Sequence, residues 1–147
     1  MSTATADYPP RLLEAAAFLK EHDPAVAEWP PERYLEWFDC LWRKGCVGVV
    51  RQNGSVCAVA VARCVGDIED ALCDNYLHHE DPVAGPFLWC DQIASNHPLG
   101  LSHLLALARK RFGPRTDVGG QVFNKNGRLR KLPWHRVNQL LSSHGLT

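Results

Sequence analysis

The sequence predicts an α/β (α+β) domain in which helices flank a central, mostly antiparallel sheet. Two kinds of segment alternate in a way that supports this class. Some show apolar residues at helical spacing, and these are residues 10–22, 30–44, 101–112 and 134–142. Others are short and rich in Val, Ala, Cys or aromatic residues, as strands are, and these are residues 46–51, 55–65, 87–93 and 118–123. The resulting order is helix, helix, strand, strand, strand, helix, strand, helix.

Paired prolines open the first two predicted helices. Proline is tolerated in the first helical turn because its missing N–H would have no partner there. The first helix follows Pro9-Pro10 and closes at His22-Asp23-Pro24. The second follows Pro30-Pro31, carries a heavy aromatic face and ends near Gly45. Both are expected to bury one apolar stripe.

A hairpin is the strongest local prediction. Strands 46–51 and 55–65 meet across Asn53-Gly54, the residue pair best suited to a type I′ turn. Both strands carry few charges, so both faces of this part of the sheet are expected to be covered. The acidic segment 66–84 follows, with a short helix predicted over 68–79, and Asn126-Gly127 marks a second turn.

The segment 85–114 contains a buried strand, a polar turn and an amphipathic helix. The strand Phe87–Ile93 is apolar apart from one carboxylate, Asp91. Gly113-Pro114 stops the helix, because glycine accepts the left-handed conformation and proline cannot continue the hydrogen-bond ladder. A helix that begins directly after a strand presents free N–H groups to an anion. This arrangement suits a phosphate-bearing cofactor.

Length and composition predict one soluble domain. The 147 residues are organised as a flexible N-terminus, residues 1–9, and a single domain, residues 10–147. No apolar run reaches the roughly 20 residues that span a bilayer, and the first residues lack the pattern of a secretory signal, so a cytoplasmic location is expected. The six cysteines form no C-x-x-C pair and are interpreted as reduced structural thiols; no metal site is predicted.

Charge is distributed unevenly along the chain. Residues 1–100 hold 7 Lys/Arg against 15 Asp/Glu, whereas residues 101–147 hold 9 Lys/Arg against a single Asp. The basic C-terminal third either binds an anionic partner or forms a solvated face that complements the acidic part. A cofactor phosphate, an acidic carrier protein and nucleic acid are the candidate partners.

The element order over residues 10–142 resembles the acyl-CoA N-acyltransferase (GNAT) fold. In that family the helix after the fourth strand begins with a pyrophosphate loop, Gln/Arg-x-x-Gly-x-Gly/Ala, and the matching place here reads His97-Pro98-Leu99-Gly100-Leu101-Ser102. Gly100 fits the pattern, while His97 and Ser102 depart from it, and the family's first strand is not apparent. The resemblance implies that acyl-CoA binds here. The implied cofactor-binding residues are Ile93, Ala94, Asn96, His97, Gly100, Leu101 and Ser102.

A narrower resemblance is to the toxin-activating lysine acyltransferases, which use acyl-carrier protein as donor. The shared features are the Trp29-Pro30 step, the strand segment Leu88-Trp89-Cys90-Asp91-Gln92-Ile93-Ala94 and a helix end Arg109-Lys110-Arg111-Phe112. In that family an N-terminal histidine and the strand aspartate are catalytic. The resemblance therefore implies Asp91 and His22 as the catalytic pair, although the spacing from His22 to Trp29-Pro30 differs from the family pattern.

Elementary chemistry leaves alternatives for both residues. Desolvation in an apolar strand would raise the pKa of Asp91 toward a useful range, or the carboxylate caps a loop or pairs with a C-terminal arginine. His22 either takes part in proton transfer or caps its helix. The predicted function is transfer of an acyl group from a phosphopantetheine thioester, on coenzyme A or acyl-carrier protein, to an amine such as a protein lysine. The alternative is an inactive GNAT-like module that binds protein or nucleic acid through its basic third.

Overall fold

A computed structural model defines the fold. It describes residues 8–23, 27–66, 85–115, 117–120 and 132–146. The helices within these residues are α1 Pro10–His22, α3 Pro31–Arg43, α5 Gly100–Phe112 and α6 Trp134–Ser143. The strands are β1 Val47–Gln52, β2 Ser55–Val65, β3 Phe87–Ser95, β4 Asp117–Gly120 and β5 Leu132–Pro133. The predicted helix 68–79, the turn at Asn126-Gly127 and the end of the strand predicted over 118–123 lie outside the described residues.

The strands form one sheet in the order β1-β2-β3-β4-β5. The pairs β1/β2, β2/β3 and β4/β5 are antiparallel, and β3/β4 is parallel. The parallel pair arises because α5 carries the chain from the end of β3 back to the start of β4, as parallel pairing requires. The predicted class, a mostly antiparallel sheet flanked by helices, is confirmed.

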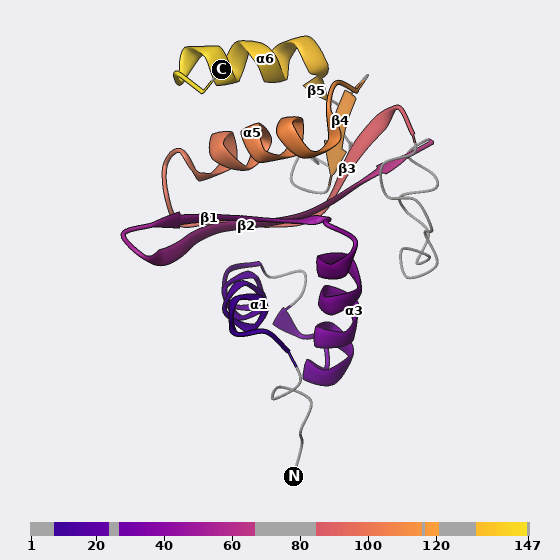
Figure 1. The fold of residues 1–147 in the computed structure, drawn as a ribbon, viewed down its shortest axis with the longest axis vertical. Coiled ribbons are helices and arrows are strands. Elements are labelled where there is room, and N and C mark those ends of the chain that lie inside the picture. Colours follow the sequence, from indigo (N-terminus) through magenta and orange to yellow (C-terminus); the bar gives the residue numbers. More distant parts are fainter. Residues whose placement is uncertain (1–7, 24–26, 67–84, 116, 121–131, 147) are drawn as a thin grey trace.

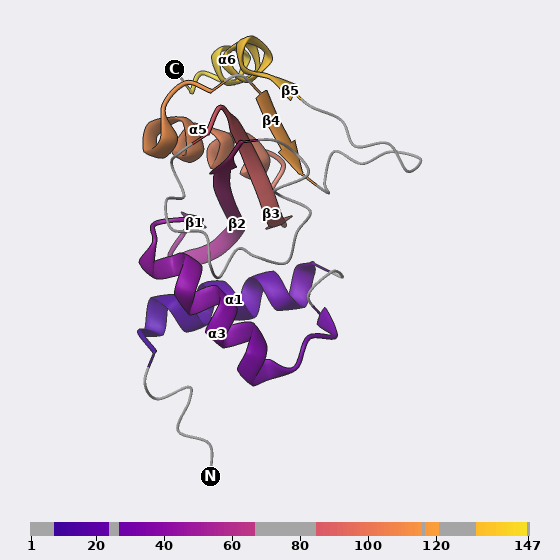
Figure 2. The same cartoon turned by 90° about the vertical axis from the view of Figure 1, so that its right-hand side faces the viewer.

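Helices cover both faces of the sheet. In Figure 1, α1 and α3 lie on one face, and α5 and α6 lie on the other; the turned view in Figure 2 shows the same separation. Val59 and Val61 of β2 belong to the core formed with α1 and α3, whereas Ala62 and Cys64 belong to the core formed with α5 and α6. This alternation follows from the two-residue period of a strand. The Val/Ala/Cys-rich composition of β2 therefore reflects burial on both sides.

The middle of β3 contains a β-bulge. Val61 of β2 pairs with Gln92 and the next residue, Ala62, pairs with Cys90, so Asp91 is the extra residue. A bulge locally breaks the ladder and changes the direction of the side chains around it. Residues directly opposite each other share a face, so Gln92 lies on the same face as Val61, toward α1 and α3. Cys90 instead lines a small cavity with Leu101 and Leu104 of α5.

Candidate functional site at the bulge of strand β3

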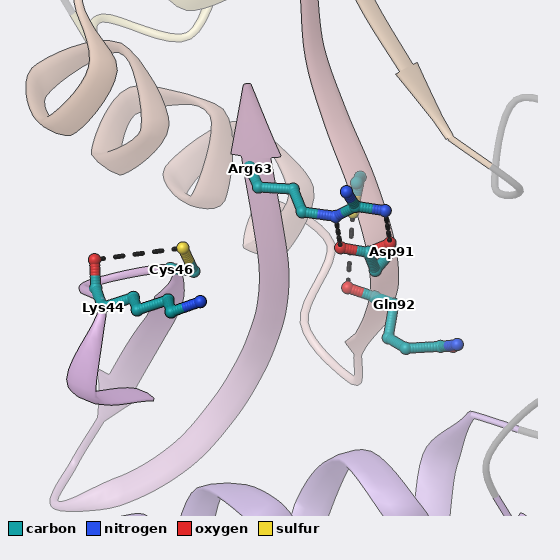
Figure 3. Close-up of polar contacts among 6 residues, drawn as sticks. Lys44, Cys46, Arg63, Asp91 and Gln92 are labelled. Atoms are coloured by element: carbon teal, nitrogen blue, oxygen red, sulfur yellow. Dashed lines mark hydrogen bonds and ion pairs between the residues drawn. The ribbon is translucent and has the colours of Figure 1, made fainter. Parts of the chain in front are cut away.

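Asp91 forms a buried ion pair with Arg63 of β2. The guanidinium Nε lies 3.0 Å from Asp91 Oδ2 and Nη2 lies 3.3 Å from Oδ1, a bidentate arrangement (Figure 3). The two side chains are only 3% and 9% exposed. A guanidinium at this distance favours the ionised carboxylate, in the opposite sense to desolvation. The alternative partner predicted for Asp91 was a C-terminal arginine, whereas its counter-charge in the structure is Arg63 of the neighbouring strand.

The bulge explains how the pair can form. Arg63 lies opposite Trp89, two residues after Val61, and so on the face of β2 toward α1 and α3. Without the extra residue, strand alternation would place Asp91 and Gln92 on opposite faces. The bulge lets both lie on the α1/α3 face, where Asp91 meets Arg63.

Two cysteines lie near the ion pair. Cys46, which precedes β1, has its pKa raised to about 11, mainly because it is buried, with the Asp91 charge raising it and the Arg111 and Arg63 charges lowering it. Its thiol points toward the Lys44 carbonyl (Figure 3). Burial also raises the pKa of Cys90, and the charges of Asp91 and Asp23 add to the effect. Thiols with raised pKa values are poor nucleophiles at neutral pH, in agreement with the structural interpretation of the cysteines.

His22 lies at the exposed end of α1. Its Nδ1 is 3.0 Å from the Phe18 carbonyl oxygen, and its ring stacks on the Phe18 ring with centroids 4.2 Å apart. These contacts match the helix-capping alternative. The next residue, Asp23, influences the pKa of the Cys90 thiol, which places the end of α1 near the middle of β3. A catalytic role for His22 stays a prediction.

The turn between β3 and α5 is held by short-range hydrogen bonds. His97 is central to it: its Nδ1 accepts from the Leu99 amide at 3.1 Å, and its carbonyl accepts from the Gly100 amide at 3.0 Å. No side chain caps α5, and no acidic residue lies in its first turn. The amides of Leu101 and Ser102 therefore remain the free N–H groups that every helix N-terminus carries. They point along the helix axis toward the turn, as an anion site requires.

Gly100 is required by close packing. A Cβ at this position would clash with Ser95 Oγ and lie 3.1 Å from the Ala58 Cβ. The helix therefore starts directly against β2 and β3, and any larger residue would displace its first turn. The sequence pointed to Gly100 through its place in the turn, and the structure gives the physical reason for glycine.

The other predicted cofactor-binding residues occupy different environments. Ile93 lines the cavity under α5, whereas Ala94 belongs to the core with α1 and α3. Asn96 is exposed and its amide donates to the Cys57 carbonyl at 2.9 Å. Ser102 is buried, with its hydroxyl 2.6 Å from Nδ1 of His144 at the end of α6. The contact between Ser102 and His144 could not be found from sequence, because 42 residues separate the two.

Several of the C-terminal arginines have structural contacts. Arg109 donates to the Asn138 side chain and to the Leu146 carbonyl, which ties α5 to α6. Arg111 donates to the Gly45 and Lys44 carbonyls after α3. Arginines in these positions satisfy carbonyl groups at chain ends and helix ends. Part of the positive charge of the C-terminal third therefore lies in side chains that bind groups of the same chain.

Comparisons with known proteins identify the class of fold. No family model matches the chain, and no curated protein matches it. A solved structure described as the GphF GNAT-like decarboxylase in complex with isobutyryl-CoA is similar, with a TM-score of 0.54 and 21% sequence identity. The match covers 77% of this chain and 62% of that chain, so the chain spans less than two thirds of the neighbour's length. The protein thus has a GNAT-like fold.

Among the described residues, no group of three or more His, Cys, Asp or Glu side chains is arranged to hold a metal ion. In the same part of the chain, no helix combines the length and apolar character that crossing a membrane demands.

Proposed function

We propose that the protein binds a phosphopantetheine thioester and transfers its acyl group to an amine. One observation carries the proposal: within one continuous segment, a bulged strand bearing Asp91 leads directly to the uncapped start of α5. The GNAT-like neighbour, described as a complex with isobutyryl-CoA, supports an acyl-thioester ligand. The phosphates would meet the Asn96–Ser102 turn, and the pantetheine arm would follow β3 toward Asp91.

The length of the strand fits this placement. From Asp91 to Ser95 the strand advances by four residues, or about 13 Å at the usual rise. An extended pantetheine arm spans a comparable distance between its phosphate and its sulfur. A ligand with its phosphates at the turn would therefore carry its thioester to the bulge.

The reaction requires a base and a stabilised thiolate. The amine nitrogen attacks the thioester carbonyl carbon, the carbon–sulfur bond breaks, and the amine proton passes through a base to the departing sulfur. A carboxylate already bound to a guanidinium is a weaker proton acceptor than a free one. We therefore assign Asp91 to hold the positively charged amine or imidazolium, and His22 to accept the proton, because histidine is the side chain that most often serves as a general base.

The acceptor and donor follow from the narrower resemblance. The segment Leu88–Ala94 and the Arg109–Phe112 helix end resemble toxin-activating lysine acyltransferases, which favours a protein lysine as acceptor and acyl-carrier protein as donor. Acyl-CoA remains the other donor to test.

Titration calorimetry with coenzyme A, isobutyryl-CoA and phosphate-free pantetheine tests binding. We expect both CoA ligands to bind and pantetheine to bind at least about tenfold more weakly, because it lacks the charges that the α5 amides attract. Gly100→Ala should weaken CoA binding, whereas Gly48→Ala is a matched control, because its Cβ would lie at an ordinary 3.6 Å from Leu104 Cδ2. Equal affinity for pantetheine and coenzyme A would contradict the assigned turn.

Transfer is tested separately, with acyl-CoA and acyl-carrier protein as donors and a lysine peptide as acceptor. Asp91→Asn and His22→Gln should each reduce kcat and leave coenzyme A binding in place. A malonyl-CoA arm tests decarboxylation, the activity in the neighbour's description. Binding without transfer from either donor would overturn the acyltransferase proposal and keep the thioester-binding one.

The second candidate is a module that binds nucleic acid or protein through the basic C-terminal third. The observation that favours it is Lys110, which is exposed on α5. Its signature is binding to DNA or RNA that weakens steeply with salt and is indifferent to coenzyme A.

A further inference from the structure

Strand β1 forms an edge of the sheet. Within the described residues its sheet neighbour is β2, and the order β1-β2-β3-β4-β5 places it first. An edge strand presents a row of backbone N–H and C=O groups to any chain that can pair with it. Natural edges are commonly protected by proline or several charges. The β1 segment, Val-Gly-Val-Val-Arg-Gln, has a single charge and no proline.

A groove runs beside this edge under α5. A hollow of about 350 Å³ lies between Val49–Arg51 and one face of α5, and it adjoins a hollow of about 260 Å³ that extends to Gly45. Leu107 lines both hollows and is 39% exposed. Residues spaced three and four apart share a helix face. The α5 face over the groove consists of His103, Ala106, Leu107 and Lys110.

Small residues create the groove. Gly48 faces α5, since a Cβ there would point at Leu104 and Leu107 at 3.6 and 3.8 Å. Ala60 and Ala62 of the adjacent strand line the same hollow. With no side chain at Gly48, the floor of the groove is backbone and methyl groups. An additional strand beside β1 would cover the exposed part of Leu107 and remove its apolar surface from water.

Two basic residues of α5, Lys110 and Arg111, line the groove, and no acidic residue is among its described lining residues. Arg51 also lines it, but its charge is paired with Glu14 at 2.7 Å. The Arg111 guanidinium donates to backbone carbonyls and keeps its charge. Lys110 lies on the α5 face beside Leu107. The potential at this edge therefore favours an anionic occupant.

We propose that β1 and α5 form a docking site for an extended acidic segment of a partner protein. The segment adds to the β1 edge as a strand, with its backbone paired to β1. Alternate side chains of an added strand point to the same face, so an apolar residue covers Leu107 and an acidic residue two positions away reaches Lys110. This docking site is separate from the turn between β3 and α5, and it does not depend on the proposed acyl transfer.

The probe is the peptide acetyl-Thr-Val-Thr-Glu-Thr-Val-Thr-amide, which reads the same in both strand directions. Binding is measured by calorimetry at low and moderate salt, and by hydrogen exchange of the β1 amides. We expect saturable binding that protects β1 amides and weakens with salt, because an exposed charge pair contributes. The same peptide with Lys in place of Glu should bind at least about tenfold more weakly. N-methylation of alternate peptide amides should abolish binding, because it removes the donors that pair with β1.

Variants locate the site on the protein. Lys110→Glu should weaken peptide binding about tenfold, and Gly48→Val, which fills the groove, should also weaken it. Arg136→Glu on α6 is the matched control, because Arg136 is an exposed helical arginine that donates to the Gln139 side chain, and it should leave binding unchanged. Thermal unfolding and far-UV circular dichroism check that each variant is folded.

The proposal is overturned by no binding, by equal binding of the N-methylated peptide, or by equal binding to Lys110→Glu. Sedimentation equilibrium supplies the remaining outcome. A dimer that protects the β1 amides and excludes the peptide would show that a second copy of this chain covers the edge. That result would overturn the proposal of an acidic partner.

Discussion

The ion pair between Arg63 and Asp91 gives the sharpest prediction for stability. Its two N···O contacts are 3.0 and 3.3 Å, and the side chains are 3% and 9% exposed. Removing one partner of a buried pair leaves an uncompensated charge and costs about 3–5 kcal/mol. Asp91→Asn and Arg63→Met should each lower the free energy of unfolding by about that amount, a large part of the roughly 5–15 kcal/mol of a typical domain.

The double variant separates pairing from packing. Arg63→Met combined with Asp91→Leu replaces both charges by apolar groups, and such replacements are often neutral or stabilising. We expect it to be more stable than either single variant. The matched control is the pair Arg51–Glu14, which has a shorter contact of 2.7 Å but side chains 26% and 46% exposed. Exposed pairs contribute little, so Glu14→Gln should change stability only slightly.

Urea denaturation followed by tryptophan fluorescence measures all of these variants in one cycle. Single-variant losses below about 1 kcal/mol, or additive effects in the double variant, would refute the reasoning, because neighbouring charges in a buried pair must couple. The same variants test function. If Asp91 acts on the substrate amine, the folded double variant should bind coenzyme A and fail to transfer the acyl group.

Three further results are expected. Gly100→Ala should lower the urea midpoint and weaken coenzyme A binding together, whereas Gly48→Ala should do neither. Burial raises the pKa of Cys46 from 9.0 to about 11. The contribution of its neutral thiol to stability is therefore complete below pH 9 and is lost, by roughly 2–3 kcal/mol, as pH rises toward 11. Cys46→Ala should flatten the curve of stability against pH over that window. Tyr34→Phe removes a buried hydrogen bond of 2.7 Å to the Ala16 carbonyl and should destabilise the fold by about 1–3 kcal/mol, measured by thermal unfolding.

Local signals in the sequence located most elements correctly. The predicted first helix, residues 10–22, matches α1, and the hairpin turn has positive φ at both Asn53 and Gly54, as type I′ requires. Gly113 ends α5 with φ +73°, also as predicted. These features depend on residues adjacent in the chain, through proline at a helix start and glycine or asparagine in left-handed conformations.

Features that depend on pairing between strands were missed. The partner of Asp91 is 28 residues away, and the pair requires the bulge that sets the register of β2 and β3. One signal was present: Arg63 is the only charged residue in a strand otherwise made of Val, Ala, Cys and Ser, and a buried lone arginine needs an acidic partner. The short strand β5 was not predicted, because two residues, Leu132–Pro133, are too few to show a period.

The position of the Arg63–Asp91 ion pair helps to distinguish the part of the site proposed for acyl transfer from the part proposed for donor binding. The core between the sheet and α1 and α3 is otherwise formed by apolar residues, and apolar side chains in place of a buried ion pair are often as stabilising or better. The pair is set by a bulge, a feature that serves to redirect side chains, and the end of α1 with His22 and Asp23 approaches from the same face. The proposed phosphate binding at the turn needs neither charge. In the proposed function the α5 end of β3 therefore anchors the donor and the bulge receives the acceptor amine, so substitutions at the two ends should affect coenzyme A affinity and kcat separately.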